Sequence, residues 1–360
     1  MADTPARRDL TLAFDDVESV QTACETFRTL FQDLRTAIGR IIVGQDEVVE
    51  QTLMALFADG HVLLEGVPGL GKTLLVRTLG DALSMPYARI QFTPDVMPAD
   101  ITGTNMVLED PTTGTRVFTF KPGPIFHQLI LADEINRATP KSQAALLEAM
   151  QERSVTVAGR THDLERPFLV MATQNPIEQE GTYPLPEAQL DRFLFKISVP
   201  FTTREELNEI LTETTTHREA SIDAVLDVAT ILDAQALVRR IVVAPHVQDF
   251  AIRLVMATHR GGEHSIRDAE RYISIGVSPR GGQALITAAK VRALVQGRYA
   301  VSFGDIAAIA GPALRHRILP SFEAEADGVT TDMIVEMLLE RVPRDMPSDG
   351  DAAPTVRYGT

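Results

Sequence analysis

The chain has 360 residues, a formal net charge of −15 at pH 7, 44% hydrophobic residues and 23% charged residues. This length and composition are typical of a globular protein with two domains. Sequence-independent binding to nucleic acids depends on Lys and Arg neutralising phosphates, so the acidic balance argues against that activity.

The cysteine count and the hydropathy pattern indicate the compartment. With one cysteine, Cys24, the chain cannot form an internal disulfide, and it has no CxxC pair or HExxH helix that would bind zinc. We therefore expect a reducing compartment, the cytoplasm. Residues 1–16 lack an apolar segment of signal-peptide length, and no run of about 18 apolar residues occurs. The sequence predicts a flexible N-terminus and no direct insertion into a membrane.

Two amphipathic segments precede the first expected strand. Apolar residues at three- and four-residue steps predict helices over residues 17–40 and 47–58. Between them lies Val43-Gly44-Gln45, which by spacing alone is a helix-breaking turn. The second helix leads into an apolar strand at residues 61–65.

The strongest functional signal follows that strand. The segment Gly66-Val-Pro-Gly-Leu-Gly-Lys-Thr73 matches the GxxxxGK[ST] pattern and stands before a helix expected over residues 74–84. Lys72 would contact the β- and γ-phosphates of ATP, and the Thr73 hydroxyl would hold Mg²⁺. A glycine-rich turn with an exposed lysine is the alternative, which the strand-then-helix context disfavours. The loop residues expected to surround the phosphates are Gly66, Pro68, Gly69, Leu70 and Gly71. All of these except Pro68 have a backbone N–H group that can donate to a phosphate oxygen.

An irregular segment at residues 93–124 follows a second expected strand at 87–92. Within it, residues 103–108 and 115–121 flank the turn sequence Asp110-Pro-Thr-Thr-Gly114. Proline and glycine preset the backbone of a turn, so the pattern predicts a hairpin inserted between elements of the sheet. A structureless surface loop is the alternative.

An acidic pair ends the next expected strand. Residues 128–132 form a continuous apolar run that leads into Asp133-Glu134. Two carboxylates at the end of a buried strand are costly unless they bind or react. Downstream of a phosphate loop, they fit a Walker B pair, in which Asp133 binds Mg²⁺ and Glu134 polarises the attacking water. The alternative is that the two acidic residues only connect the strand to a loop and have no catalytic role.

Three further elements lead to a polar residue at a strand end. The pattern predicts a helix over residues 140–151, a second hairpin over 154–164 and a buried strand over 168–173. Asn175 follows that strand, where an amide beside a phosphate site could orient the hydrolytic water. Taken alone, an Asn before Pro176 also fits a turn initiator.

The spacing of apolar residues changes near residue 203. Up to there, strands alternate with helices, ending with a short helix at 185–190 and a strand at 194–199, which predicts a parallel sheet covered on both faces. Beyond it, helical spacing predominates, over residues 205–215, 222–241, 246–259, 281–295 and 306–319. The expected organisation is a flexible segment 1–16, a nucleotide-binding core 17–202, a helical domain 203–345 and a flexible tail 346–360.

Taken together, these motifs closely resemble the MoxR family of AAA+ ATPases, over nearly the whole chain. The segments that carry the resemblance are Ile41–Gln45, the phosphate loop, Leu131–Arg137, Ala172–Pro176, Leu190–Phe193 and Val277–Arg280. The resemblance implies an α/β fold, with a P-loop core around a parallel five-stranded sheet and an all-helical lid, usually assembled into a hexameric ring. The two hairpins would correspond to the family's helix-2 and pre-sensor-1 inserts, which face the pore.

The resemblance also implies roles for individual residues. The segment Val43–Gln45 would flank the adenine, and Asn175 would be sensor 1. Arg280 would be sensor 2, supplied by the lid. Arg192 would be the arginine finger offered to the neighbouring subunit.

The leading hypothesis is an ATP- and Mg²⁺-dependent ring protein that remodels a protein client. Members of the family commonly work with von Willebrand factor A domain proteins as chaperone-like factors that insert metals or mature enzyme complexes. A helicase-like nucleic-acid motor is the alternative, disfavoured by the acidity and by the lack of an appended nucleic-acid-binding module. A scaffold that binds nucleotide without turnover would require a damaged site, whereas the residue types here are intact.

Overall fold

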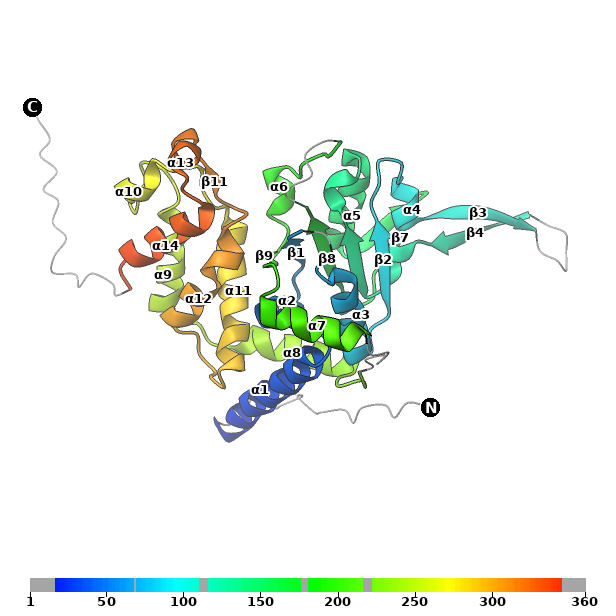
Figure 1. Cartoon of the computed structure of the whole chain (residues 1–360), viewed down its shortest axis with the longest axis horizontal. Helices are drawn as coiled ribbons and strands as arrows, with labels where there is room; N and C mark the ends of the chain where they lie inside the picture. Colours follow the sequence, from blue (N-terminus) through cyan, green and yellow to red (C-terminus); the bar gives the residue numbers. More distant parts are fainter. Residues whose placement is uncertain (1–16, 68, 110–115, 176–180, 216–221, 345–360) are drawn as a thin grey trace, which may run out of the picture.

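The computed structural model describes residues 17–67, 69–109, 116–175, 181–215 and 222–344. Pro68, Pro176, the turn sequence Asp110–Gly114 and the two expected flexible ends lie outside these ranges. Within the described chain, an α/β core lies beside a group of helices, and a long hairpin projects from the opposite side of the core (Figure 1).

As far as it is described, the core begins with two helices and contains nine strands. Its helices are α1 (Val17–Gly39), α2 (Asp46–Phe57), α3 (Lys72–Ala82), α4 (Pro98–Thr102), α5 (Pro140–Glu152) and α6 (Glu187–Leu190), with short 3-10 turns at η1 (Pro124–Phe126) and η2 (Ile135–Arg137). Its strands are β1 (Val62–Glu65), β2 (Tyr87–Gln91), β3 (Gly103–Glu109), β4 (Arg116–Pro122), β5 (Leu129–Asp133), β6 (Ser154–Val157), β7 (Arg160–Asp163), β8 (Leu169–Gln174) and β9 (Phe195–Ser198).

Five of these strands form one parallel sheet in the order β2-β5-β8-β1-β9. Since all five run the same way, the segments that follow β1, β5 and β8 meet at one edge of the sheet. The phosphate loop, Asp133-Glu134 and Asn175 therefore come from neighbouring strands. The parallel five-stranded sheet expected from the resemblance is confirmed.

Alternate side chains of the sheet enter two separate buried clusters. Val62 and Leu64 of β1 pack with α1, α2 and α3, whereas Leu63 between them belongs to a second cluster with Ile130 and Val170. Successive side chains of a strand point to opposite faces, so an apolar run such as Val62–Leu64 is buried on both sides. This is why the core strands read as continuous apolar segments.

Both predicted hairpins are present as separate two-stranded sheets. β3 pairs with β4, and β6 pairs with β7, each antiparallel. The ring of Phe120 in β4 stacks on that of His162 in β7, with ring centroids 4.1 Å apart, so the bases of the two hairpins contact each other.

The C-terminal part of the chain is helical. Its helices are α7 (Arg204–Thr215), α8 (Val228–Arg240), α9 (Pro245–Met256), α10 (Arg267–Glu270), α11 (Pro279–Val295), α12 (Phe303–Leu314), α13 (Phe322–Asp327) and α14 (Thr331–Arg341). Beside the expected helices, the lid contains an antiparallel pair, β10 (Ile273–Ile275) and β11 (Leu319–Pro320).

Several helix boundaries in the lid differ from the prediction for identifiable reasons. The helix expected from residue 222 begins only at Val228, because the Asp227 side chain caps it by accepting a hydrogen bond from the Thr230 N–H. The helix expected from residue 306 begins earlier, at a capping box formed by Ser302 and Asp305. The helices α13 and α14 were not predicted at all, although Ser321 and Thr330 are N-cap residues of the preferred type.

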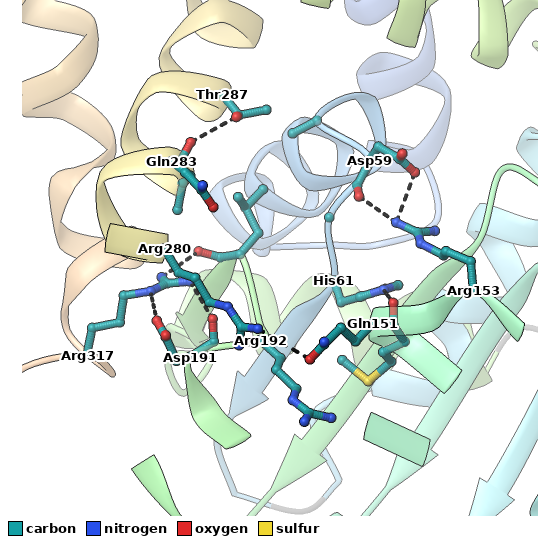
Figure 2. Close-up of a pocket in the computed structure, with 15 residues that line it drawn as sticks. Asp59, His61, Gln151, Arg153, Asp191, Arg192, Arg280, Gln283, Thr287 and Arg317 are labelled. Carbon is teal, nitrogen blue, oxygen red and sulfur yellow. Dashed lines mark hydrogen bonds and ion pairs between the residues drawn. The ribbon is translucent and has the colours of Figure 1, made fainter. Parts of the chain in front are cut away.

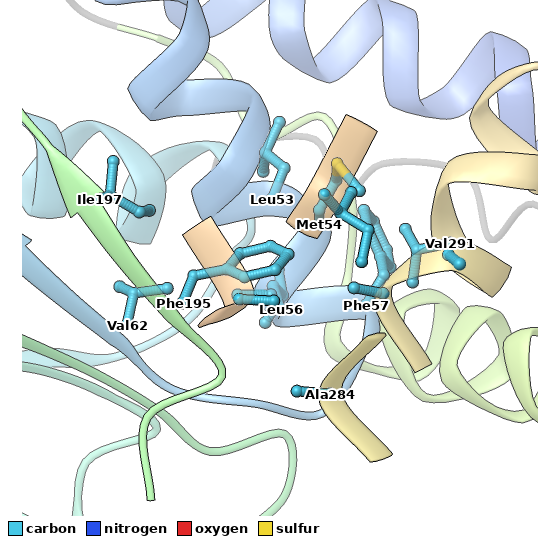
Figure 3. Close-up of a cluster of buried hydrophobic side chains, with 14 of the residues drawn as sticks. Leu53, Met54, Leu56, Phe57, Val62, Phe195, Ile197, Ala284 and Val291 are labelled. Atoms are coloured by element: carbon cyan, nitrogen blue, oxygen red, sulfur yellow. The ribbon is translucent and has the colours of Figure 1, made fainter. Parts of the chain in front are cut away.

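One apolar cluster connects the sheet to the lid. Figure 3 shows Leu53, Met54, Leu56 and Phe57 of α2 between the strand residues Val62, Phe195 and Ile197 and the α11 residues Ala284 and Val291. The lid helix α11 therefore packs on the helix layer that covers the sheet. None of the helices in the described part of the chain is long and apolar enough to cross a bilayer.

Candidate active site

The phosphate loop lies between β1 and α3, as the motif requires. Gly69 and Gly71 have φ values of 86° and 73°, in the left-handed region that glycine adopts without strain. Helix α3 begins directly after Gly71, with no side chain capping its first N–H groups. These groups and the positive end of the helix are available to an anion.

The phosphate loop lines a cavity of about 250 Å³, which we call the nucleotide cavity. A second cavity, of about 280 Å³, lies elsewhere and is described below. The residues that line this nucleotide cavity are Gly69, Gly71, Lys72, Thr73, Arg89, Asp133, Glu134, Thr173 and Asn175. The tertiary structure thus gathers the predicted phosphate loop, the acidic pair and Asn175 in one place.

Of the remaining predicted nucleotide residues, Gly66, Leu70 and Gln45 are joined to the loop by hydrogen bonds. The Lys72 Nζ donates to the Gly66 carbonyl at 2.7 Å, and the Gln45 side chain donates to the Leu70 carbonyl at 2.7 Å. Gly44, with φ 73°, stands so close to the Glu206 side chain that a Cβ there would clash with it. The segment Val43–Gln45 is therefore held between the phosphate loop and helix α7.

Lys72 is the cation that the phosphate loop supplies to the cavity. Burial lowers the pKa of Lys72 from its ordinary value, whereas the nearby Asp133, Glu134 and Glu65 carboxylates oppose that shift. A bound phosphate would add negative charge beside the ammonium group and further favour the charged form. Lys72 is thus placed to act as the point charge that a triphosphate needs.

The acidic pair is positioned by Thr173 on the neighbouring strand β8. The Thr173 hydroxyl donates to Asp133 Oδ1 at 2.7 Å and accepts the Glu134 N–H at 2.8 Å. Glu134 has φ 58°, a left-handed conformation that costs a non-glycine residue about 1 kcal/mol or more. Its backbone is held in this conformation where the strand ends, and its carboxylate lines the cavity beside Asp133.

Side chains from β2 complete the surroundings of the pair, and sequence reasoning missed them. Arg89 donates to Asp133 Oδ2 through Nη2 at 2.7 Å and Nε at 3.2 Å, and Gln91 donates to Glu134 Oε2 at 2.9 Å. The parallel register places Gln91 opposite Asp133. The available signal was the alternation of Arg89 and Gln91 on one face of an expected strand, but only the strand order shows that this strand borders β5.

The cavity offers ligands suited to Mg²⁺. The Thr73 hydroxyl and the Asp133 carboxylate are hard oxygen donors and line the same cavity. The described residues contain no group of three or more His, Cys, Asp or Glu side chains that could hold a metal by themselves. Mg²⁺ is commonly held by one or two protein oxygens together with substrate phosphates and water, so these residues fit it.

Two predicted residues, Arg192 and Arg280, lie elsewhere. Both line the second cavity, of about 280 Å³, between the core and α11, and neither lines the nucleotide cavity (Figure 2). Arg192 precedes β9, whereas the phosphate loop follows β1, and these strands pair in parallel with Val62 opposite Phe195. The two sites therefore lie beyond opposite ends of these strands, each of which has four residues and is about 13 Å long at ~3.3 Å per residue.

The second cavity is built around Asp191, the neighbour of Arg192. Arg317 donates to Asp191 Oδ1 through Nε at 2.8 Å, and the Ser278 hydroxyl donates to Asp191 Oδ2 at 2.7 Å. Arg280 donates to the Gln151 side chain at 3.3 Å, and the buried Nε of Arg192 has no hydrogen-bond partner among the described residues. A structural ion pair between Arg192 and Asp191 is therefore not formed, because Arg317 and Ser278 bind that carboxylate instead.

Comparison with known families gives two matches. Residues 61–195 match the model of the ATPase family associated with various cellular activities (AAA), and residues 266–338 match the AAA lid domain. The first covers β1, β5, β8 and β2 of the sheet, ends at the first residue of β9 and includes the nucleotide cavity. The second covers α10 to α13 and most of α14.

Individual relatives resemble the chain over most of its length. It is 42% identical to Chaperone MoxR1 of Mycobacterium tuberculosis, over 89% of this chain and 84% of that protein. It is 33% identical to Protein MoxR of Methylorubrum extorquens, over 85% of this chain and 92% of that protein. A solved structure of a candidate ATPase from Cytophaga hutchinsonii superposes with a TM-score of 0.84 at 38% identity, covering 91% of this chain and 98% of that one.

Proposed function

Because this chain belongs to the MoxR family of AAA ATPases and hydrolyses ATP, we propose that it uses hydrolysis to remodel a protein client as a chaperone. The observation that carries the proposal is the 42% identity to Chaperone MoxR1 across 84% of that protein, combined with a nucleotide cavity that brings Lys72, Thr73, Asp133, Glu134 and Asn175 together.

Each residue of the nucleotide cavity has its own role in ATP hydrolysis. Lys72 binds the β- and γ-phosphates, and Thr73 and Asp133 hold Mg²⁺, which neutralises phosphate charge when bound. Glu134 accepts a proton from the attacking water, and Asn175 orients that water through its amide. Val43–Gln45 flanks the adenine, an assignment supported by the hydrogen bond from Gln45 to the phosphate loop.

The working unit of the proposal is a closed ring, a hexamer. The nucleotide cavity and the cavity of Arg192 and Arg280 lie at opposite edges of one sheet, so neither arginine completes its own chain's site. A head-to-tail arrangement of subunits would bring the two edges together. We therefore assign both Arg192 and Arg280 to the nucleotide of the neighbouring subunit, and Arg280 does not bridge to its own γ-phosphate.

The finer assignments follow the family. The client is a protein complex that acquires a metal or matures with the help of a von Willebrand factor A domain partner, and the compartment is the cytoplasm. The two hairpins contact the client from the pore. Support for that role comes from exposed apolar side chains on the longer hairpin, Met106, Val107 and Phe118.

The experiment is capture of the client with a variant that holds ATP. Glu134→Gln removes the proton acceptor while leaving the phosphate contacts, so it should bind ATP and fail to cleave it. Affinity purification from the native lysate with ATP should then enrich a defined set of proteins that includes a von Willebrand factor A domain protein.

The matched control is Lys72→Ala, which loses a ground-state contact to the phosphates and should bind ATP weakly and capture nothing. Equal capture by both variants would contradict an ATP-dependent chaperone. Strong stimulation of the wild-type ATPase by DNA or RNA would favour the helicase-like motor instead.

A further inference from the structure

Two side chains of the edge strand β2 hold both members of the acidic pair. Arg89 binds Asp133 Oδ2 through two of its nitrogens, at 2.7 and 3.2 Å, and Gln91 binds Glu134 Oε2 at 2.9 Å. The Arg89 guanidinium also donates to the Gln91 side-chain oxygen. The four residues therefore form one chain of contacts, from Asp133 through Arg89 and Gln91 to Glu134.

Arg89 binds the carboxylate oxygen of Asp133 that a divalent metal would need as its ligand. Asp133 Oδ1 already accepts the Thr173 hydroxyl at 2.7 Å, so Arg89 takes the other oxygen, Oδ2. A carboxylate that binds a metal through Oδ2 cannot keep both hydrogen bonds from Arg89 on that atom. Two positive charges at one carboxylate oxygen also repel each other.

The surroundings of the Arg89 side chain allow it to move away from Asp133. Its side chain is 47% exposed, and Asp133 is its ion-pair partner across the cavity wall. Ion pairs with an exposed arginine contribute little to stability, so exchanging one does not unfold the site. Buried arginines of this protein, such as Arg317, donate instead to several backbone carbonyls and are fixed.

We propose that Arg89 is the counter-ion of Asp133 in the metal-free site and exchanges with the divalent metal that arrives with ATP. This inference rests on the proposed role of Asp133 as metal ligand. Because Arg89 also holds Gln91, its departure loosens the contact between Gln91 and Glu134. Arg89 is thus a positioning residue: it keeps the Glu134 carboxylate hydrogen-bonded to Gln91 until metal binds.

The exchange predicts effects of opposite sign on two kinds of binding. Arg89 competes with the metal for Asp133, so removing its charge should strengthen metal binding. The same guanidinium offsets the negative charge of Asp133 in the cavity, so removing it should weaken binding of metal-free nucleotide, which is an anion. General damage to the site would weaken both.

The experiment uses the full chain with a non-hydrolysable ATP analogue and Mn²⁺ as the metal probe. Free Mn²⁺ is followed by electron paramagnetic resonance, and nucleotide binding in EDTA is followed by calorimetry. For Arg89→Met we expect half-saturation at an Mn²⁺ concentration lower by about 1.4-fold to fivefold, the range of an exposed ion pair, and weaker binding of the analogue in EDTA. Arg89→Lys, which keeps the charge, should fall between this variant and wild type.

The matched control is Arg35→Met, which removes one arginine from an exposed ion pair with Glu50 on α1 and α2. It should leave both measurements at wild-type values. Unchanged metal binding in Arg89→Met, or weakening of metal and metal-free nucleotide binding together in both Arg89→Met and Arg89→Gln, would overturn the exchange. Unchanged Mn²⁺ binding in Asp133→Asn would instead refute the proposed metal ligand, which is a separate failure.

Discussion

His61, the residue before β1, shows how a single buried side chain ties the sheet to α5. Its Nδ1 accepts the Val170 N–H at 3.1 Å, so its Nε2 carries the proton and donates to the Met150 carbonyl at 3.2 Å. Burial, and after it the charge of Arg153, lowers the pKa of His61 to about 3, although the Met150 carbonyl favours the charged form. The folded protein therefore holds this imidazole neutral.

Because His61 is held neutral in the folded protein, the free energy of unfolding depends on pH. Its pKa is about 3 in the folded state and ~6.5 in the unfolded state, so the unfolded chain binds a proton first as the pH falls. The stabilising contribution is complete above about pH 6.5 and decreases toward pH 3. His316 is also buried, and its pKa is lowered by burial and by Arg317, so it acts in the same direction.

We expect His61→Gln to reduce the pH dependence of the unfolding free energy between pH 6 and 4.5. One proton fewer should be taken up on unfolding, which lowers the slope by about 1.4 kcal/mol per pH unit. The measurement is urea denaturation at several pH values, with the exposed His246→Gln as control. A slope identical to that of wild type would show that His61 is not held neutral.

At the scale of elements, Arg317 joins the end of α12 to the segment before β9. Its guanidinium donates to the carbonyls of Asp191, Phe193 and Leu194 and to the Asp191 carboxylate at distances between 2.6 and 3.1 Å. Burial lowers the pKa of Arg317, and Asp191 opposes that shift. These contacts fix the lid beside the segment that carries Arg192.

We expect Arg317→Met to destabilise the protein by about 3–5 kcal/mol, because it leaves a carboxylate and several carbonyls without their donor in a buried place. Its side chain is only 3% exposed. Arg341→Met is the matched control, since it removes a 62% exposed arginine paired with Asp268 and should cost at most ~1 kcal/mol. Similar losses for the two variants in chemical denaturation would contradict a structural role for Arg317.

At the scale of the whole molecule, the proposed ring would bring the nucleotide cavity of one subunit to the cavity of Arg192 and Arg280 of the next. In a head-to-tail ring, an arginine that acts on the neighbour stabilises charge only in the transition state of that neighbour's reaction. Such a residue is worth about 10³-fold or more in rate. Its removal leaves the nucleotide cavity of its own chain intact.

We expect Arg192→Ala to bind ATP normally and to hydrolyse almost none. Mixing it with Glu134→Gln, which keeps Arg192, should restore part of the ATPase activity, because some interfaces then combine an intact cavity with an intact arginine. Arg280→Ala should behave in the same way in mixtures with Glu134→Gln. No recovery at any ratio, with mixed rings confirmed by native mass spectrometry, would rule out action on the neighbour.

The sequence by itself determined most elements of the core, and it identified the phosphate loop and the acidic pair of the nucleotide cavity. Glycine spacing, the lysine and threonine after it, and the acidic pair at a strand end are local signals, since each depends on residues adjacent in the chain. The alternation of expected strands and helices from residue 61 to 199 predicted the parallel sheet covered on both faces. Its strands are apolar throughout because they are buried on both faces. Capping residues such as Ser302 and Asp227 also carried local information about helix starts.

Only the tertiary structure decided which side chains share a cavity. The strand order places β2 beside β5, and this brings Arg89 and Gln91 to the acidic pair. It likewise places Arg192 and Arg280 together at the edge of the sheet opposite the phosphate loop. Such contacts join residues tens of positions apart and depend on how strands pair and helices pack, which the periodicity of one segment does not encode.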